Sequence, residues 1–214
     1  MGNPSRVIGP QRDHGEREGV ALTFDDGPDA EWTPRILAAL DEADAIATFF
    51  VTPRLGMDVV TEIAAAGHEI GYHCGEHVRH TERERDEVAG EARADLETLA
   101  GAGIEVRCWR PPWGVLAGWT PELAADLGLA IRLWNVDTED WAGHSASDML
   151  SWISPAIGAG AVVLMHDGIG PGARRSDPAA TAALVPGLVA LIRGRGLEPV
   201  AVSPEPVRHD RILA

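Results

Sequence analysis

The sequence predicts an α/β fold in which a parallel sheet is covered by helices. Apolar, β-prone runs alternate with helix-like segments along the chain, and no linker rich in serine, glycine or proline divides its 214 residues. Strands buried on both faces are apolar in this way, and alternation of strand and helix is typical of parallel sheets. About seven strands at a regular repeat favour a barrel over an open sheet.

The strands are expected where short apolar runs end in turn-forming residues. In chain order they are predicted at 20–24, 47–51, 68–72, 106–109, 130–136, 161–165 and 197–202. The helices between them carry an apolar stripe, and two begin at Thr33-Pro34 and Thr120-Pro121, where proline suits the first turn. They are predicted at about 33–43, 58–66, 81–102, 120–128, 146–157 and 179–193.

Residues 1–19 are polar and charged, which predicts an irregular arm ahead of a single domain over 20–214. The arm resembles no signal peptide, and no apolar run reaches membrane-spanning length, so we expect a cytoplasmic protein. A net charge of −15 argues against binding to nucleic acid or to an anionic membrane surface. All 18 basic residues are arginine, which excludes lysine chemistry. The oligomeric state is left open.

Ionisable groups follow five of the predicted strands. They are Asp25-Asp26, His73 with His77, Arg110, Asp137 with Asp140, and His166-Asp167. Functional residues of parallel α/β folds lie just past the carboxyl ends of the strands. We therefore expect these side chains to meet on one rim of the sheet.

His73 and His77 are four residues apart, so in a helical turn both imidazoles would face the same way. Such a pair suits zinc or another divalent first-row metal, and one carboxylate would complete a set with open positions for water and substrate. Only one of Asp25 and Asp26 need bind the metal, and the other could be the base that deprotonates water. The alternative is an acidic turn beside an incidental histidine pair.

Arg110 precedes two prolines and is well placed to hold a carboxylate, although a surface salt bridge is the alternative. His166 follows an apolar strand, where a core histidine is the ordinary interpretation. A nearby Asp137 would raise the pKa of the imidazole and favour its protonated, acidic form.

Five segments, in order, resemble the motifs of the polysaccharide deacetylase family, the NodB-homology domain of carbohydrate esterase family 4. They are Thr23-Phe24-Asp25-Asp26-Gly27-Pro28, His73-Cys74-Gly75-Glu76-His77, Arg110-Pro111-Pro112-Trp113-Gly114, Asp137-Thr138-Glu139-Asp140-Trp141 and Leu164-Met165-His166-Asp167. The resemblance covers about Val20 to Val202. It implies a distorted (β/α) barrel with about seven repeats and metal-dependent removal of an N-acetyl group from an amino sugar.

The resemblance also implies a metal site and a catalytic set. Asp26, His73 and His77 would bind one divalent ion, with zinc preferred and cobalt, nickel or manganese left open. Asp25 would be the base, oriented by Arg110.

His166 would be the acid that protonates the leaving amine, tuned by Asp137. The backbone N–H of Trp113 would help to hold the oxyanion. Trp141 and Leu164 would form the walls of the acetyl pocket. Pro111, beside Trp113, is also expected to contact the saccharide.

Two features depart from the family pattern or lie outside it. Cys74 replaces the usual serine or threonine, and a weakly donating thiol would hold its loop less firmly; it could also ligate zinc or be a small buried residue. Arg174 and Arg175, in the loop after His166, would meet an anionic group of the substrate, unless they are solvated.

Three functions are weighed. The leading hypothesis is a metal-dependent N-deacetylase of a chitooligosaccharide or similar saccharide. The second keeps the fold and hydrolyses a formamide, an acetate ester or another small amide. The third is a sugar-binding pseudoenzyme, which the complete set of expected catalytic residues argues against.

Overall fold

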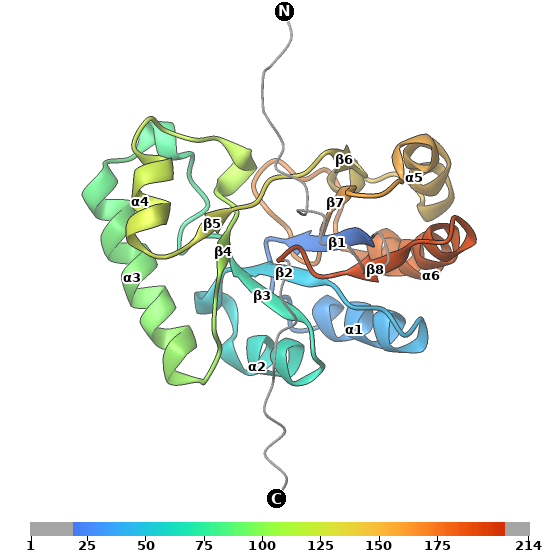
Figure 1. Cartoon of the computed structure of the whole chain (residues 1–214), viewed down its shortest axis with the longest axis horizontal. Coiled ribbons are helices and arrows are strands. Elements are labelled where there is room, and N and C mark those ends of the chain that lie inside the picture. The colour runs from blue at the N-terminus through green and yellow to red at the C-terminus, as the bar shows by residue number, and fades with distance from the viewer. Residues whose placement is uncertain (1–18, 204–214) are drawn as a thin grey trace, which may run out of the picture.

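The computed structural model describes residues 19–203, in which eight strands alternate with helices. The strands form one curled sheet, and the helices pack around its outside (Figure 1). The strands are β1 Gly19–Asp25, β2 Thr48–Val51, β3 Glu69–Tyr72, β4 Cys108–Trp109, β5 Ala130–Ile131, β6 Val136–Asp137, β7 Val162–His166 and β8 Glu198–Val200. The α-helices are α1 Trp32–Glu42, α2 Met57–Ala65, α3 Arg85–Gly101, α4 Thr120–Asp126, α5 Ala146–Ile153 and α6 Ala179–Gly194.

The sheet runs in the order β5-β4-β3-β2-β1-β7-β6, and β8 pairs with the first residues of β1. Every pairing is parallel, so the carboxyl ends of the strands lie on one rim. The edge strands β5 and β6 do not pair with each other, which leaves the barrel open at that point. The predicted distorted barrel is confirmed.

One predicted strand, at 130–136, is wrong as a single element. Ala130 and Ile131 pair with β4, whereas Val136 and Asp137 pair with β7, at the opposite edge of the sheet. Residues 130–137 connect the two edges of the curled sheet, which explains their apolar character. The segment is only long enough for a two-residue strand at each edge. The helix predicted at 81–102 begins later, at Arg85, after a 3₁₀ turn over His80–Glu82.

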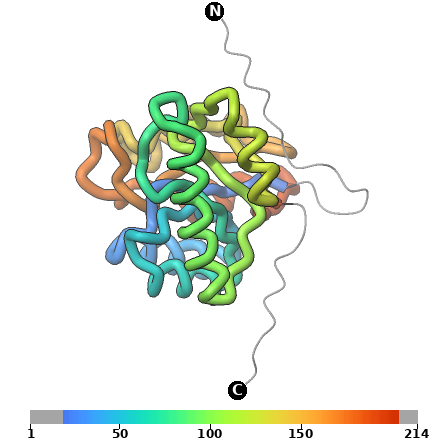
Figure 2. Tube along the Cα trace, turned by 90° about the vertical axis from the view of Figure 1, so that its left-hand side faces the viewer, coloured from blue at the N-terminus to red at the C-terminus, as the bar shows by residue number. Residues whose placement is uncertain are grey.

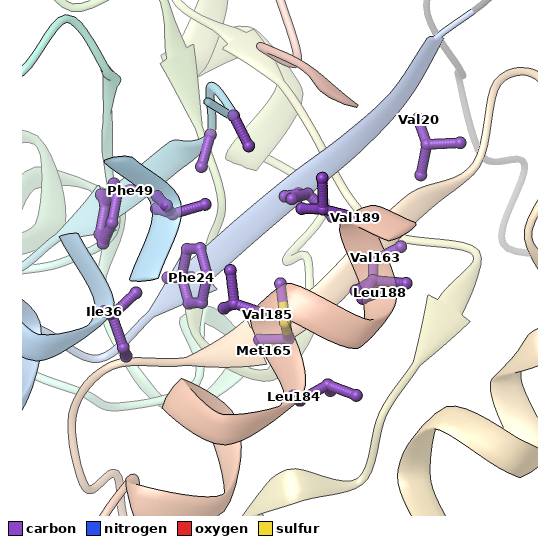
Figure 3. Close-up of a cluster of buried hydrophobic side chains, with 14 of the residues drawn as sticks. Val20, Phe24, Ile36, Phe49, Val163, Met165, Leu184, Val185, Leu188 and Val189 are labelled. Carbon is purple, nitrogen blue, oxygen red and sulfur yellow. The ribbon is translucent and has the colours of Figure 1, made fainter. Parts of the chain in front are cut away.

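The main core lies between the sheet and the helices α1, α2, α5 and α6. Figure 3 shows Phe24 of β1 and Met165 of β7 beside Val185 of α6, and Val163 of β7 beside Leu188 of α6. Each such side chain, when fully buried, contributes roughly 1.5–3 kcal/mol to folding. The central strands β1 and β7, which carry site residues at their ends, are therefore held rigidly.

A second cluster fixes α3 and α4 against β3 and β4, the side of the molecule that faces the viewer in Figure 2. Tyr72 and Trp109 pack there on Val88 and Ala92 of α3 and on Leu123 of α4. This packing places one face of α3 against the residues that follow β3. No helix between residues 19 and 203 is long and apolar enough to cross a membrane. The predicted arm lies outside the described residues, apart from Gly19.

Candidate active site

The predicted convergence of ionisable groups on the rim is confirmed. Asp25 is the register partner of His166 across β1 and β7, and the β3–β4 register brings His73 and Arg110 to the same end. Asp25, His73 and His166 line one pocket of about 300 Å³, and Arg110 lies outside this lining, in contact with Asp25. Its lining consists of Asp25, Asp26, His73, His77, Trp113, Trp134, Asp137, Trp141, Leu164, His166, Gly168, Gly170, Pro171, Gly172, Ala173 and Arg175.

The three predicted metal ligands come together. Asp26 Oδ1 lies 3.2 Å from His73 Nε2 and 3.0 Å from His77 Nε2. The three potential ligand atoms lie within 4.8 Å of one another. Asp26 has a φ of 71°, a left-handed conformation that costs energy in a non-glycine residue and is typical of functional sites.

The donor set fits a divalent metal ion. Asp26 Oδ1 and His73 Nε2 are buried, yet neither has a hydrogen-bond partner of good geometry in the described part of the chain. Buried polar atoms are rarely left in that state. Burial raises the pKa of Asp26, but the two histidines outweigh it and hold that pKa well below the usual value, so the carboxylate is ionised. Two nitrogens and one oxygen suit zinc and its first-row neighbours.

The segment from His73 to His77 is not the helical turn on which the predicted pairing rested. Its residues are neither helix nor strand. The His73 end is fixed by β3, because the backbone N–H of His73 donates to Val51 (2.9 Å) and Nδ1 lies 2.6 Å from the carbonyl oxygen of Arg110. The two imidazoles are therefore brought together by the conformation of the loop, not by the spacing of residues on a helix.

Asp25 is held by Arg110, as predicted. Arg110 Nη1 donates to Asp25 Oδ1 at 2.7 Å and to Thr23 Oγ1 at 2.8 Å. Its other donors reach the carbonyl oxygens of Arg132 and Leu133, and its side chain is completely buried. One oxygen of Asp25 is thus fixed at the pocket, and the carboxylate is oriented for work as a base.

His166 is paired with Asp140, not with Asp137, which corrects the prediction. Its Nδ1 lies 2.7 Å from Asp140 Oδ1, and its backbone N–H donates to Asp140 Oδ2 at 2.9 Å. Burial lowers the pKa of His166, but the charge and hydrogen bond of Asp140 outweigh burial and, with Asp26 and Asp25, raise it to about 9. The imidazole is therefore protonated at neutral pH, as an acid must be.

Asp137 still lines the pocket. Its carboxylate accepts the backbone N–H of Glu139 at 2.8 Å, and burial raises its pKa. After β6 the chain turns at Glu139, whose φ is 51°. This turn places Asp140, rather than Asp137, within hydrogen-bond distance of the His166 ring.

The predicted arginine pair divides into two different environments, and contact of either residue with an anionic group of the substrate stays a prediction. Its guanidinium donates to Asp140 Oδ2 (2.9 Å) and to the carbonyl oxygens of His166 (2.9 Å) and Gly168 (3.0 Å), and only 5% of its side chain is exposed. Arg175 therefore braces the acid pair. Arg174 is exposed, and its guanidinium lies 5.7 Å from the ring centre of Trp141.

The predicted substrate contacts are placed unevenly. Trp113, Trp141 and Leu164 line the pocket, whereas Pro111 is buried outside its lining. Trp113 is the second residue of the 3₁₀ turn Pro112–Gly114, so its N–H has no partner within the turn. Its oxyanion role stays a prediction.

Arg79 makes a cation–π contact with Trp113, in which its guanidinium lies 4.3 Å from the ring centre. A further tryptophan, Trp134, also lines the pocket and was missed. It lies between β5 and β6, within the segment predicted as one continuous strand, and no signal in the sequence distinguished it.

Cys74 is a small buried residue. Its Sγ lies 3.6 Å from Thr52 Oγ1, and burial raises the pKa of the thiol. It is not among the residues that approach the metal cluster in the described chain. Cys108 is likewise buried and free.

Comparison with known proteins agrees with this geometry. The family model described as polysaccharide deacetylase matches residues 12–131. A chitooligosaccharide deacetylase of Bradyrhizobium sp. (strain ANU 289) is 35% identical over 182 residues, which cover 80% of this chain and 82% of the relative.

Two solved structures are also similar. The Bc1960 peptidoglycan N-acetylglucosamine deacetylase, in complex with 4-naphthalen-1-yl-N-oxidanyl-benzamide, superimposes with a TM-score of 0.80 and 30% identity, covering 87% of this chain and 86% of that one. A family 4 carbohydrate esterase from Streptomyces lividans, in complex with acetate, gives a TM-score of 0.78 and 30% identity, covering 87% and 94%.

Fold and site together define a hydrolase whose reacting groups lie on the open rim of a curled parallel sheet. The chain belongs to the polysaccharide deacetylase family, carbohydrate esterase family 4, and is a carbohydrate N-deacetylase that acts on a carbon–nitrogen bond.

Proposed function

We propose that this enzyme removes the N-acetyl group from N-acetylglucosamine units of a chitooligosaccharide, with release of acetate. The observation that carries the proposal is the assembly, around one pocket, of a buried Asp25–Arg110 pair, the Asp26–His73–His77 cluster and the His166–Asp140 pair. Amide hydrolysis requires an activated water, a stabilised oxyanion and a proton for a poor leaving group.

Asp26, His73 and His77 would hold one divalent ion, which we propose to be zinc. When bound, it supplies Lewis-acid activation of water and of the amide carbonyl. Asp25 accepts the proton of the attacking water, and Arg110 keeps the accepting carboxylate in place. The N–H of Trp113 donates to the oxyanion that develops on the carbonyl, and such a donor contributes about 3–4 kcal/mol to catalysis.

His166 then donates a proton to the departing amine nitrogen. Its pKa of about 9 ensures that the proton is present at neutral pH, and Asp140 stabilises the imidazolium until it is used. Trp141 and Leu164 form apolar walls that suit the methyl group of an acetyl. Trp134 is a further wall residue and a candidate contact for the sugar ring.

Chitooligosaccharide is proposed because two chitooligosaccharide deacetylases, 35% and 31% identical to this chain, match it over 80% and 86% of its length. Peptidoglycan is the alternative N-acetylglucosamine substrate, because peptidoglycan deacetylases of Listeria monocytogenes and Bacillus cereus are 34% and 36% identical over 69% of the chain. Activity on N-formyl groups or on acetate esters remains the second candidate, since the same catalytic groups would serve it.

The test is acetate and formate release from a panel of chitooligosaccharides, peptidoglycan fragments, N-formyl sugars and O-acetyl sugars. Each substrate is assayed with wild type and Asp25→Asn, before and after chelation, and after zinc is restored. We expect zinc-dependent acetate release from chitooligosaccharides that Asp25→Asn abolishes. Release confined to formate or to O-acetyl substrates would overturn the substrate assignment, and saccharide binding without turnover would indicate a pseudoenzyme.

A further inference from the structure

In the part of the chain that the structure describes, the second ring nitrogen of His77 has no hydrogen bond that would orient the ring. His77 packs edge-on against Trp113, with ring centres 4.2 Å apart, but its Nδ1 is buried without a hydrogen-bond partner in residues 19–203. Metal-binding histidines almost always donate that second N–H to an acceptor, which orients the ring. The position of the His77 ring therefore depends on its packing against Trp113 and on the backbone of its loop.

Cys74 does not supply this support. Its thiol contacts Thr52 at 3.6 Å, and a thiol is a weak hydrogen-bond partner. The N–H groups of Gly75 and Glu76 instead point to a residue on α3. Both donate to the same atom, Glu91 Oε1, at 3.1 and 3.2 Å.

Glu91 is itself held in place. Its other oxygen, Oε2, accepts a hydrogen bond from Arg83 Nη1 at 3.1 Å and lies 3.8 Å from Arg54 Nη1. Only 9% of the Glu91 side chain is exposed, so its charge is largely shielded from water. Hydrogen bonds from backbone N–H groups to an ionised carboxylate are about twice as strong as neutral ones.

The loop is also packed closely against this network. A side-chain carbon added at Gly75 would lie 2.6 Å from the Arg54 guanidinium carbon and 2.7 Å from Asp95 Oδ2. Arg54 cannot easily move away, because its Nε donates to Asp95 Oδ1 at 3.1 Å. Asp95 in turn accepts the hydroxyl of Tyr72 at 3.1 Å, which ties the network to β3.

We infer that Glu91 is a positioning residue that holds the His73–His77 loop in its metal-binding conformation. Glu91 is not among the residues that line the pocket in the described chain, and it acts through the N–H groups of Gly75 and Glu76. The inference rests on the metal site of the proposed function. Removing an outer partner of this kind typically weakens metal binding about 10- to 100-fold.

The experiment measures Zn²⁺ affinity by competition with a chromogenic chelator, using metal-free full-length protein. The variants are Glu91→Ala, Glu91→Gln and the control Glu87→Ala. Glu87 lies one turn earlier on α3, is 63% exposed and approaches Arg83 only at 3.9 Å. Circular dichroism and the Tm of each metal-free protein report on folding independently of the metal.

We expect Glu91→Ala to bind Zn²⁺ about 10- to 100-fold more weakly than wild type. Glu91→Gln, whose amide oxygen still accepts the two N–H groups, should recover part of the affinity, and Glu87→Ala should match wild type. Affinity of Glu91→Ala and Glu91→Gln within twofold of wild type would overturn the inference while leaving the metal site intact. Failure of the wild type to bind Zn²⁺ would instead overturn the metal site of the proposed function, and the inference with it.

Discussion

Replacing Asp140 by asparagine removes the negative charge that keeps His166 protonated. Asp140 Oδ1 lies 2.7 Å from His166 Nδ1; Asp140 is completely buried, and 14% of the His166 side chain is exposed. The pKa of His166 is raised from 6.5 to about 9 although burial opposes the increase, and Asp140 provides the largest favourable contribution. A difference of that size corresponds to roughly 3 kcal/mol in favour of the protonated ring.

The sign of the effect on rate follows from the role of His166 as the acid. Only the protonated ring can donate, so kcat/KM of the wild type should decrease as pH rises through the His166 pKa. Loss of a charge at this distance lowers such a pKa by about 1–3. The decrease of kcat/KM at high pH, the alkaline limb of the pH profile, should therefore begin about 1–3 pH units lower in Asp140→Asn than in the wild type.

The assay is the pH dependence of kcat/KM for acetate release by the zinc-loaded enzymes, supported by NMR titration of the His166 ring. Asp137→Asn is the matched comparison, because Asp137 also lines the pocket, but its carboxylate accepts the Glu139 N–H, whereas the His166 ring is hydrogen-bonded to Asp140. We expect it to move the limb less than Asp140→Asn does. An alkaline limb that stays in place in Asp140→Asn, or that moves more in Asp137→Asn, would refute the reasoning.

Three further predictions follow from buried contacts. Arg110→Met leaves Asp25 buried without its partner and should reduce the free energy of unfolding by about 3–5 kcal/mol in urea titrations, with a large part of the loss recovered in the Arg110→Met/Asp25→Asn double variant. Gly170→Ala would place a carbon 2.0 Å from Asp26 Oδ2, so Zn²⁺ affinity should decrease; unchanged affinity would show that the loop can move away. Arg175→Gln should slow acetate release with little change in KM, because Arg175 donates to Asp140, the partner of the acid His166; an effect confined to KM would instead indicate a substrate contact.

The arrangement of the strands was predictable because it depends on local patterns. Apolar runs that end in charged residues mark the strands, and parallel sheets place those ends on one rim. Asp25, His73, Arg110 and His166 were therefore expected together; Asp25, His73 and His166 line one pocket, and Arg110 contacts Asp25 and His73.

The features that were not predicted depend on contacts between distant segments. The pairing of residues 130–137 is decided by which sheet edge each end reaches, and its apolar pattern suits one strand or two. Asp137 ends β6 and Asp140 follows three residues later, and only the turn at Glu139 decides which of them meets His166.

The role of Arg175 was missed for a related reason. An arginine in an acidic chain suggests an anionic ligand, whereas its partners here are Asp140 and two carbonyl oxygens of the chain itself. The support of the His73–His77 loop by Glu91 on α3 was equally hidden, because the two segments meet only through tertiary packing.

The central claim is that the adjacent carboxylates Asp25 and Asp26 have separate tasks, one as base and one as metal ligand. The most direct test is to measure bound zinc per chain and acetate release for Asp25→Asn and Asp26→Asn, each against wild type. We predict that Asp25→Asn keeps about one zinc ion per chain but is slower by about 10²–10⁴-fold, whereas Asp26→Asn loses zinc and rate together. Full zinc in both variants, or loss of zinc from Asp25→Asn alone, would contradict the account.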